Sequence, residues 1–197
     1  MTDLLQIHRR VMEQSVAIVN HVTIDDLARP TPCEGWTLRD LLAHMMGQNY
    51  GFAAAARARQ DRSAFAPRPV GSDPAGEYQA SATRVVDAFS TPGLLDGHMY
   101  LPEVRDGMVL PAVTAVEFHV VDYVVHAWDV ARTIGVSIEY DDDILQVARR
   151  IAEEVPDTAK SPEPHTPFGP ALRTTSGAAL DQIVAMLGRS PEWRPTL

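Results

Sequence analysis

The sequence predicts an all-α protein built as a bundle of helices. Apolar residues recur at the three-and-four spacing of amphipathic helices along most of the chain, and strand-like alternation is scarce. No run approaches the ~20 apolar residues that a membrane-spanning helix needs. A chain of 197 residues can also form one sizeable core without disulfides, because it buries about 70% of its unfolded surface. We therefore expect a single domain.

Three helices are predicted in the first half of the chain. The second helix has the clearest start, because Thr37 and Asp40 form a capping box. The first helix must end before the Pro30/Pro32 segment. Prolines and glycines interrupt the segment between the second and third helices, which we expect to be a loop. The expected helices span about residues 3–22, 37–60 and 77–90, with the loop at residues 61–76.

Three further helices are predicted in the second half. The fourth should run from Pro111, a residue favoured at the first helical position, to Gly135, a residue favoured just past a helix end. Before it, short apolar runs flank Asp106 and Gly107, which predicts a small hairpin or an extended excursion. The fifth and sixth helices are expected at residues 141–155 and 176–187, separated by a proline-rich stretch at residues 156–170.

The composition excludes several classes of partner. Lys and Arg number 17 against 26 Asp and Glu, so the formal net charge is −9. This charge argues against nucleic acid and against an anionic membrane surface as main partners. The single cysteine, Cys33, cannot form an intramolecular disulfide or a cysteine-rich zinc site. Together with an N-terminus unlike a signal peptide, it suggests a cytoplasmic protein. Because the chain has only one cysteine, any metal must be held mainly by histidine and carboxylate side chains.

The predicted fourth helix carries four polar groups on one face. His119, Asp122, His126 and Asp129 are spaced three, four and three apart, so they share an arc of about 80°. Nearly every other residue nearby is apolar, which is typical of a buried helix. The arc could instead be a solvent-exposed face, although such faces usually carry Lys, Glu and Arg. Two His and two Asp are residue types that bind metals or exchange protons.

Asp122 and His126 form the strongest candidate pair, because residues one turn apart can reach a single ion. Asp129 has a weaker claim, since it can instead bond a neighbouring element. Two interpretations of His119 remain open: it could support the metal ligands, or it could be a core histidine. His44, at the edge of the apolar stripe of the second helix, is the best third ligand, although a lone histidine there is more often a core residue. Two imidazoles and one carboxylate suit Zn²⁺, Ni²⁺ or Fe²⁺.

Several segments resemble the mycothiol-dependent maleylpyruvate isomerase group of the DinB-like superfamily. They are PTPCEGWT at residues 30–37, RDLLAH at 39–44, DYVVHAWDVAR at 122–132 and MLGRSP at 186–191. The last is similar to the end of actinobacterial members known only as metal-binding. The resemblance implies a DinB-like four-helix bundle with additional C-terminal helices and a metal held by His44, Asp122 and His126. Residues 1–197 would form one metal-binding domain, with a bundle core at about 3–135 and a helical extension at about 136–197.

The resemblance also implies a chemistry. Members with assigned activities use a low-molecular-weight thiol, which the metal activates for attack on an electrophile. We interpret Cys33 as a packing residue, so the thiol would arrive as a cosubstrate. Two features depart from the isomerase. The tail is too short for the additional domain that supplies an arginine to its substrate, which argues against maleylpyruvate, and Asp122 replaces a glutamate, which shortens the ligand's reach.

The sequence thus favours a divalent-metal-binding enzyme, a mycothiol S-transferase or isomerase-like protein acting on a small electrophile. One alternative is a non-catalytic, metal-stabilised binding or regulatory module, in which the ion is structural and protein ligands fill all its positions, with His119 as a candidate for the fourth ligand. Another is a non-haem iron oxygenase, since such enzymes use two histidines and one carboxylate. Tyr123 and Trp128 are interpreted as packing residues. The sequence is compatible with a homodimer.

Overall fold

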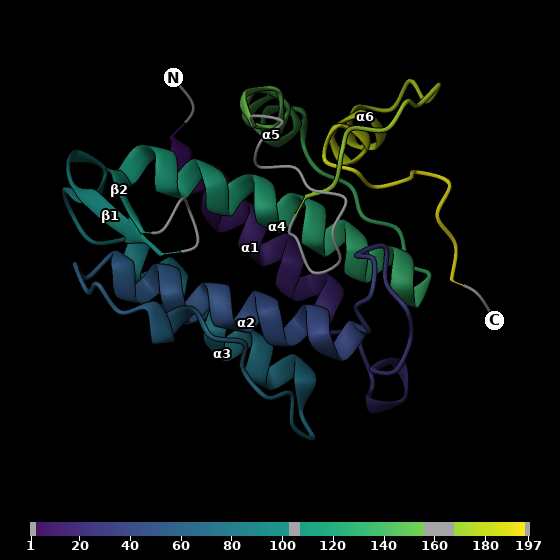
Figure 1. Cartoon of the computed structure of the whole chain (residues 1–197), viewed down its shortest axis with the longest axis horizontal. Coiled ribbons are helices and arrows are strands. Elements are labelled where there is room, and N and C mark those ends of the chain that lie inside the picture. Colours follow the sequence, from purple (N-terminus) through teal and green to yellow (C-terminus); the bar gives the residue numbers. More distant parts are fainter. Residues whose placement is uncertain (1–2, 103–106, 156–167, 196–197) are drawn as a thin grey trace.

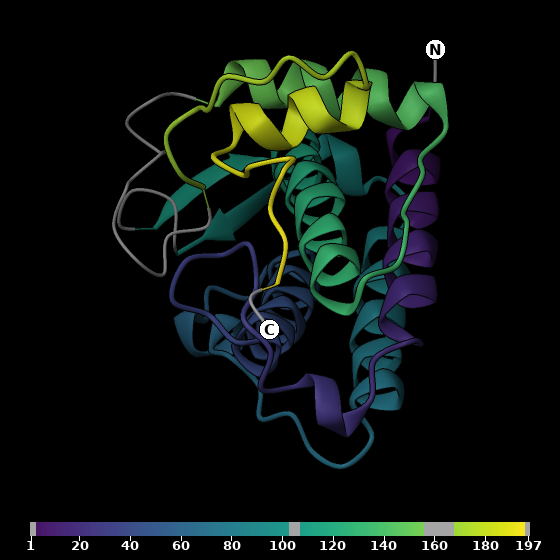
Figure 2. The same cartoon turned by 90° about the vertical axis from the view of Figure 1, so that its right-hand side faces the viewer.

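The computed structural model describes residues 3–102, 107–155 and 168–195. Four long helices pack lengthwise into a bundle, with α1 beside α4 and α2 beside α3 (Figure 1). Helix α5 lies against α4, and α6 lies beside α5 (Figure 2). The bounds are α1 Leu4–Val19, α2 Leu38–Ala55, α3 Pro74–Phe89, α4 Ala112–Ile134, α5 Asp142–Glu154 and α6 Ala179–Met186. The predicted helical bundle with additional C-terminal helices is confirmed.

Local sequence signals explain where the helices begin. Asp3 caps α1 by accepting a hydrogen bond from the Leu5 backbone N–H at 3.0 Å. The predicted capping box is present at α2, where the Thr37 backbone N–H donates to Asp40 Oδ2 at 3.0 Å. Asp73 caps α3, so this helix starts earlier than its predicted start near residue 77. Side-chain caps satisfy backbone donors that the helix itself leaves unpaired.

Two helix ends differ from the predicted ones. Helix α2 stops at Ala55, short of the predicted end near residue 60, and Ala58 adopts a left-handed φ of 57°. The chain then turns back so that the short 3₁₀ helix Arg62–Phe65 packs on α2. Tertiary packing therefore overrides the helical propensity of the alanines there. Helix α4 ends as predicted at Gly135, whose φ of 77° is a conformation that glycine adopts without strain.

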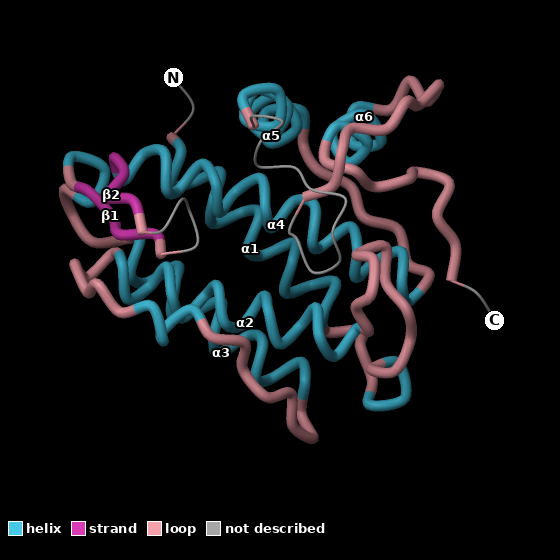
Figure 3. The backbone as a smooth tube through the Cα atoms, in the orientation of Figure 1, coloured by secondary structure: helices cyan, strands magenta, loops and turns pink. Residues whose placement is uncertain are grey.

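A small antiparallel hairpin precedes α4. Its strands are β1 His98–Leu101 and β2 Met108–Pro111, with Met99 opposite Leu110 (Figure 3). The hairpin interpretation of this segment is confirmed, although part of its turn lies outside the described residues. So does most of the proline-rich stretch predicted at residues 156–170. Among the residues that are described, none of the helices is long and apolar enough to cross a bilayer.

The bundle closes tightly where the 3₁₀ helix crosses α2. A Cβ atom on Gly47 would lie 2.7 Å from the backbone oxygen of Ala66 and 2.9 Å from that of Phe65. A Cβ on Gly51 would overlap the Phe65 ring, with its nearest atoms at 2.3 Å. These two glycines let the loop after α2 approach the helix backbone directly. This close contact between the loop and Gly47 fixes the middle of α2 about one turn after His44.

A buried histidine pair joins α1 to α4. His8 Nε2 and His119 Nδ1 lie 3.1 Å apart, and both residues are almost completely buried. The His119 ring stacks on Tyr123 with centroids 4.1 Å apart and packs edge-on against Phe52 at 4.6 Å. Burial lowers the pKa of His119 to about 3, and burial together with His119 and Arg9 lowers that of His8 well below its usual value. The pair is therefore neutral at physiological pH.

We expect Gly47→Ala to destabilise the protein by about 1–3 kcal/mol, because the added methyl group meets backbone atoms that cannot move independently. The measurement is the free energy of unfolding in urea. Gly177→Ala is the matched control, since a Cβ there meets nothing within 4 Å. It should change stability by less than about 0.5 kcal/mol. A Gly47→Ala variant as stable as the wild type would contradict the close approach.

Acid should destabilise the fold through the histidine pair. Because burial lowers the pKa of His119 from 6.5 to about 3, its contribution to stability is complete above pH 6.5 and is lost as the pH falls toward 3. The loss amounts to up to about 1.4 kcal/mol per pH unit for one such group. His119→Gln, which can still bond His8, should show a shallower fall in unfolding free energy between pH 7 and 5.

The exposed His21 provides the control for this measurement. His21→Gln should leave the pH dependence of the unfolding free energy as it is in the wild type. Equal slopes for the wild type and His119→Gln would show that the buried histidine does not couple folding to protonation.

Candidate functional site

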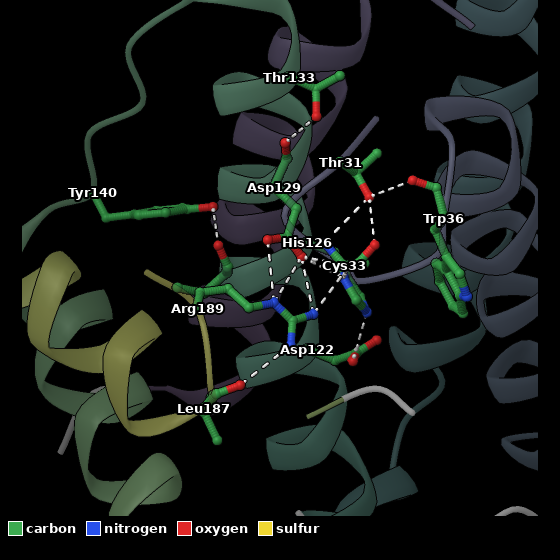
Figure 4. A network of polar contacts seen from close by, with 11 residues as sticks. Thr31, Cys33, Trp36, Asp122, His126, Asp129, Thr133, Tyr140, Leu187 and Arg189 are labelled. Atoms are coloured by element: carbon green, nitrogen blue, oxygen red, sulfur yellow. Dashed lines mark hydrogen bonds and ion pairs between the residues drawn. The ribbon is translucent and has the colours of Figure 1, made fainter. Parts of the chain in front are cut away.

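The polar face of α4 points into the protein. His119, His126 and Asp129 have exposed fractions of 0%, and the Asp122 side chain is 17% exposed. The solvent-face interpretation of this arc is therefore wrong. The segment between α1 and α2 covers the end of the arc formed by His126 and Asp129, and Figure 4 shows its residues Thr31, Cys33 and Trp36 around His126.

Three residues predicted as metal ligands come together at this place. His44 from α2 joins Asp122 and His126 from α4, and one potential ligand atom from each lies within 4.8 Å of the other two. His126 Nε2 is 3.3 Å from Asp122 Oδ1. The His44 and His126 rings meet edge-on, with centroids 5.4 Å apart. His126 is buried, whereas His44 and Asp122 are partly exposed, so the group is open on one side.

The atoms of this group suit a divalent ion. Within the part of the chain that the structure describes, the buried His126 Nε2 has no hydrogen-bond partner. Its approach to Asp122 is close enough for an ion pair, but it is not aligned as a hydrogen bond. Two donors that bind one ion tetrahedrally at about 2.1 Å lie about 3.4 Å apart, which is near the observed 3.3 Å. Two imidazole nitrogens and a carboxylate oxygen could hold Zn²⁺ or a similar ion.

The pKa values follow from burial and close charges. Burial lowers the pKa of His44 to about 4, with help from His126. Burial alone would also lower the pKa of His126, but Asp122 and Asp129 raise it well above its usual value. Burial opposes ionisation of Asp122, yet the neighbouring His126 holds its pKa at about 2. Asp122 is therefore an anion, and its charge favours positive charge at the neighbouring His126, which either a proton or a bound metal ion can supply.

The other edge of His126 belongs to a second, fully buried network. Its Nδ1 lies 3.0 Å from Asp129 Oδ2 and 3.8 Å from Cys33 Sγ. Arg189, which follows α6, donates from Nε to both Asp129 oxygens at 3.3 Å and from Nη2 to Oδ2 at 3.1 Å. Its Nη1 donates to the Leu187 carbonyl at 3.2 Å. Figure 4 shows Arg189 reaching Asp129 from the C-terminal segment.

Cys33 takes part in this network and is more than a packing residue. Its thiol donates to Asp129 Oδ2 at 3.1 Å and accepts from Arg189 Nη2 at 3.1 Å. Burial and the Asp129 charge raise its pKa, although Arg189 and His126 oppose this effect. A buried thiol with a raised pKa is a poor nucleophile, in line with the prediction that Cys33 is not the reactive thiol.

Trp36 forms one wall of the group. Its ring centroid lies 4.9 Å from that of His44 and 6.4 Å from that of His126, with the second pair stacked. Thr31 organises the turn, because its Oγ1 donates to the Trp36 carbonyl at 3.0 Å and accepts from the Cys33 N–H at 3.2 Å. The PTPCEGWT segment therefore supplies a wall, a buried thiol and the cap of α2.

Sequence reasoning missed two features of the site. Arg189 is only 4% exposed, and its one signal was an arginine placed directly after Gly188 within the MLGRSP segment. Trp36 was noted only within a longer motif. The structure pairs His119 with His8, and among the described residues it belongs to neither candidate ligand group. Asp129 bonds a neighbouring element, which was the simpler of its two interpretations.

Comparison with known proteins finds a matching family and two similar sequences. The family model described as mycothiol maleylpyruvate isomerase N-terminal domain matches residues 8–131. Two uncharacterized proteins of Mycobacterium tuberculosis, from strains CDC 1551 / Oshkosh and H37Rv, are each 31% identical over 191 residues, covering 95% of this chain and 98% of theirs.

Two crystal structures have a similar fold. The mycothiol-dependent maleylpyruvate isomerase superposes with a TM-score of 0.56 at 15% identity, and a mutant of that enzyme with 0.59 at 14%. Each comparison covers 80% of this chain and 68% of the other. The fold agrees with the sequence match, which spans more than half of the chain. The chain belongs to the mycothiol maleylpyruvate isomerase N-terminal domain family.

Proposed function

We propose that this protein is a metal-dependent enzyme that uses a low-molecular-weight thiol, mycothiol, to act on a small electrophile as an S-transferase or isomerase-like enzyme. The observation that carries the proposal is the convergence of His44, Asp122 and His126 around a buried nitrogen, His126 Nε2, that has no hydrogen-bond partner among the described residues. Family membership supports the thiol. Because such thiols are kept reduced inside the cell, we place the activity in the cytoplasm.

Each residue has a distinct role in this proposal. His44 and His126 hold the ion through imidazole nitrogens, and Asp122 supplies the negative charge. A bound Zn²⁺, Ni²⁺ or Fe²⁺ would lower the pKa of a coordinated thiol, so that the thiolate forms near neutral pH. Trp36 shields the two imidazoles on one side. Cys33 stays protonated in its buried network, so the reactive sulfur comes from the cosubstrate.

We propose that the electrophile is not maleylpyruvate. The resemblance of the sequence to the isomerase group implies that the isomerase uses an arginine from an additional domain for that substrate. Here the buried arginine of the C-terminal segment is already engaged, because Arg189 donates to Asp129, Cys33 and Leu187. It therefore has no free edge for a substrate carboxylate. The binding-module alternative requires protein ligands at every position of the ion, and its candidate fourth ligand, His119, is paired with His8. Catalysis is therefore our preferred function.

Metal content tests the ligand set. Protein purified without chelators should carry close to one divalent ion per chain, and His126→Ala should carry under ~0.1. The measurement is elemental analysis, with folding checked by circular dichroism. His21→Ala, an exposed histidine, should keep the metal. A wild-type protein with under ~0.1 metal per chain, or full retention after His126→Ala, would contradict the proposed site.

Thiol consumption tests the chemistry. The metal-loaded protein should consume mycothiol in the presence of a suitable electrophile, with glutathione, bacillithiol and a panel of electrophiles assayed in parallel. Asp122→Asn should lose most of this activity because it removes the charged ligand. Cys33→Ser should retain activity, since it keeps the buried network but lacks the thiol. If no thiol is consumed at any metal loading, the binding-module function takes precedence.

A further inference from the structure

We propose that Arg189, acting through Asp129, is a positioning residue that orients His126 toward the metal and keeps the ion away from Cys33. This inference rests on the proposed function, because it concerns the same metal ligand. Its evidence is separate: it comes from the contacts on the Nδ1 edge of His126, opposite the three-residue ligand group.

The first step concerns the His126 ring. An imidazole that binds metal through Nε2 must carry its hydrogen on Nδ1, and the partner of that hydrogen sets the ring's orientation. Here the partner is Asp129, whose Oδ2 lies 3.0 Å from Nδ1. The opposite nitrogen, Nε2, then faces Asp122, whose Oδ1 is 3.3 Å away. Asp129 thus selects which edge of His126 is available to an ion.

The second step concerns what holds Asp129. A buried carboxylate is costly unless it is paired, and a guanidinium that contacts both oxygens also prevents it from rotating. Arg189 supplies this contact from Nε and Nη2, at 3.1–3.3 Å. The orientation of His126 therefore depends on a residue that lies 60 positions beyond Asp129 in the sequence.

The third step concerns the alternative ligand group. Cys33, His126 and Asp129 also bring potential ligand atoms within 4.8 Å of one another. Arg189 Nη2 lies 3.1 Å from both Cys33 Sγ and Asp129 Oδ2. A fixed positive charge thus contacts two of the three ligand atoms and repels a metal ion there. This leaves the Nε2 side, with His44 and Asp122, as the place for the ion.

The C-terminal segment holds Arg189 by contacts of its own. Gly188, at φ 84°, lies against Gly169, so that a Cβ there would meet backbone atoms at 2.5 Å. The Gly169 N–H donates to the Leu187 carbonyl at 3.2 Å. Beyond Arg189, Arg132 Nη2 on α4 donates to the Pro191 carbonyl at 3.0 Å. The backbone on both sides of Arg189 is therefore anchored.

Cobalt titration tests the inference, with Co²⁺ as the probe and visible and near-ultraviolet absorption as readouts. Arg189→Met and Asp129→Asn should each weaken Co²⁺ binding about 10- to 100-fold. Arg189→Lys should recover part of the affinity, because its ammonium can still pair with Asp129. The double variant should lose no more than the more affected single variant, since the two residues act in series. Wild-type protein should bind Co²⁺ without a thiolate charge-transfer band.

Arg132→Met is the matched control. It removes a different tether of the same C-terminal segment without touching Asp129. Its Co²⁺ affinity should therefore stay within about threefold of the wild type, while its midpoint of unfolding in urea falls because a hydrogen bond is lost. If Arg132→Met weakens Co²⁺ binding as much as Arg189→Met does, the effect is structural and the inference is wrong. If Arg189→Met fails to fold, the Co²⁺ affinity of Arg189→Lys is compared with that of Arg132→Met instead. A loss of affinity in Arg189→Lys no greater than that in Arg132→Met would refute the inference.

Other results would overturn the proposal in distinguishable ways. An affinity change below about threefold in Arg189→Met, or losses that multiply in the double variant, would refute the positioning role. A thiolate band in the wild type would place the ion beside Cys33 and refute the selection of the Nε2 side. All three results leave metal binding intact. A wild-type protein that binds no Co²⁺ would instead overturn the proposed function, and this inference with it.

Discussion

The arrangement of the site depends on a charged pair buried beside the apolar interior of the bundle. Asp129 has no exposed surface, and an isolated carboxylate in that position would cost several kcal/mol. Arg189 compensates this charge, and the pair also engages Cys33 and His126. The C-terminal segment, the loop before α2 and the inner face of α4 therefore meet at one carboxylate, and a shift of one relative to the others would break some of its contacts.

The two edges of His126 divide the polar interior into two regions. On the Nδ1 edge every contact is buried and satisfied, which is typical of a supporting structure. On the Nε2 edge the nitrogen faces an anion but has no hydrogen-bond partner within the described part of the chain, and the two other candidate ligands, His44 and Asp122, are partly exposed. An unpaired buried nitrogen is normally disfavoured. We therefore expect a ligand to bind at the Nε2 edge of His126. Trp36 limits the directions from which this ligand can approach.

The sequence predicted the local features of the fold well. Apolar periodicity located the helices, and the Thr37–Asp40 capping box and Gly135 marked the boundaries where they were found. The spacing of Asp122 and His126 also sufficed to put both on one face, because residues one turn apart on a helix are neighbours. The early end of α2 was not predictable in this way, since the alanines beyond Ala55 favour a helix and only the return of the Arg62–Phe65 segment stops it.

The sequence by itself therefore determined the helical fold, the polar arc of α4 and the residue types that could bind a metal, because all of these follow from interactions between near neighbours. Tertiary structure decided which partners those residues have. His119 bonds His8 across 111 positions, and Arg189 reaches Cys33 across 156. Contacts of this kind arise only when packing brings distant segments together and buries their polar groups beside one another, so no local spacing could reveal them.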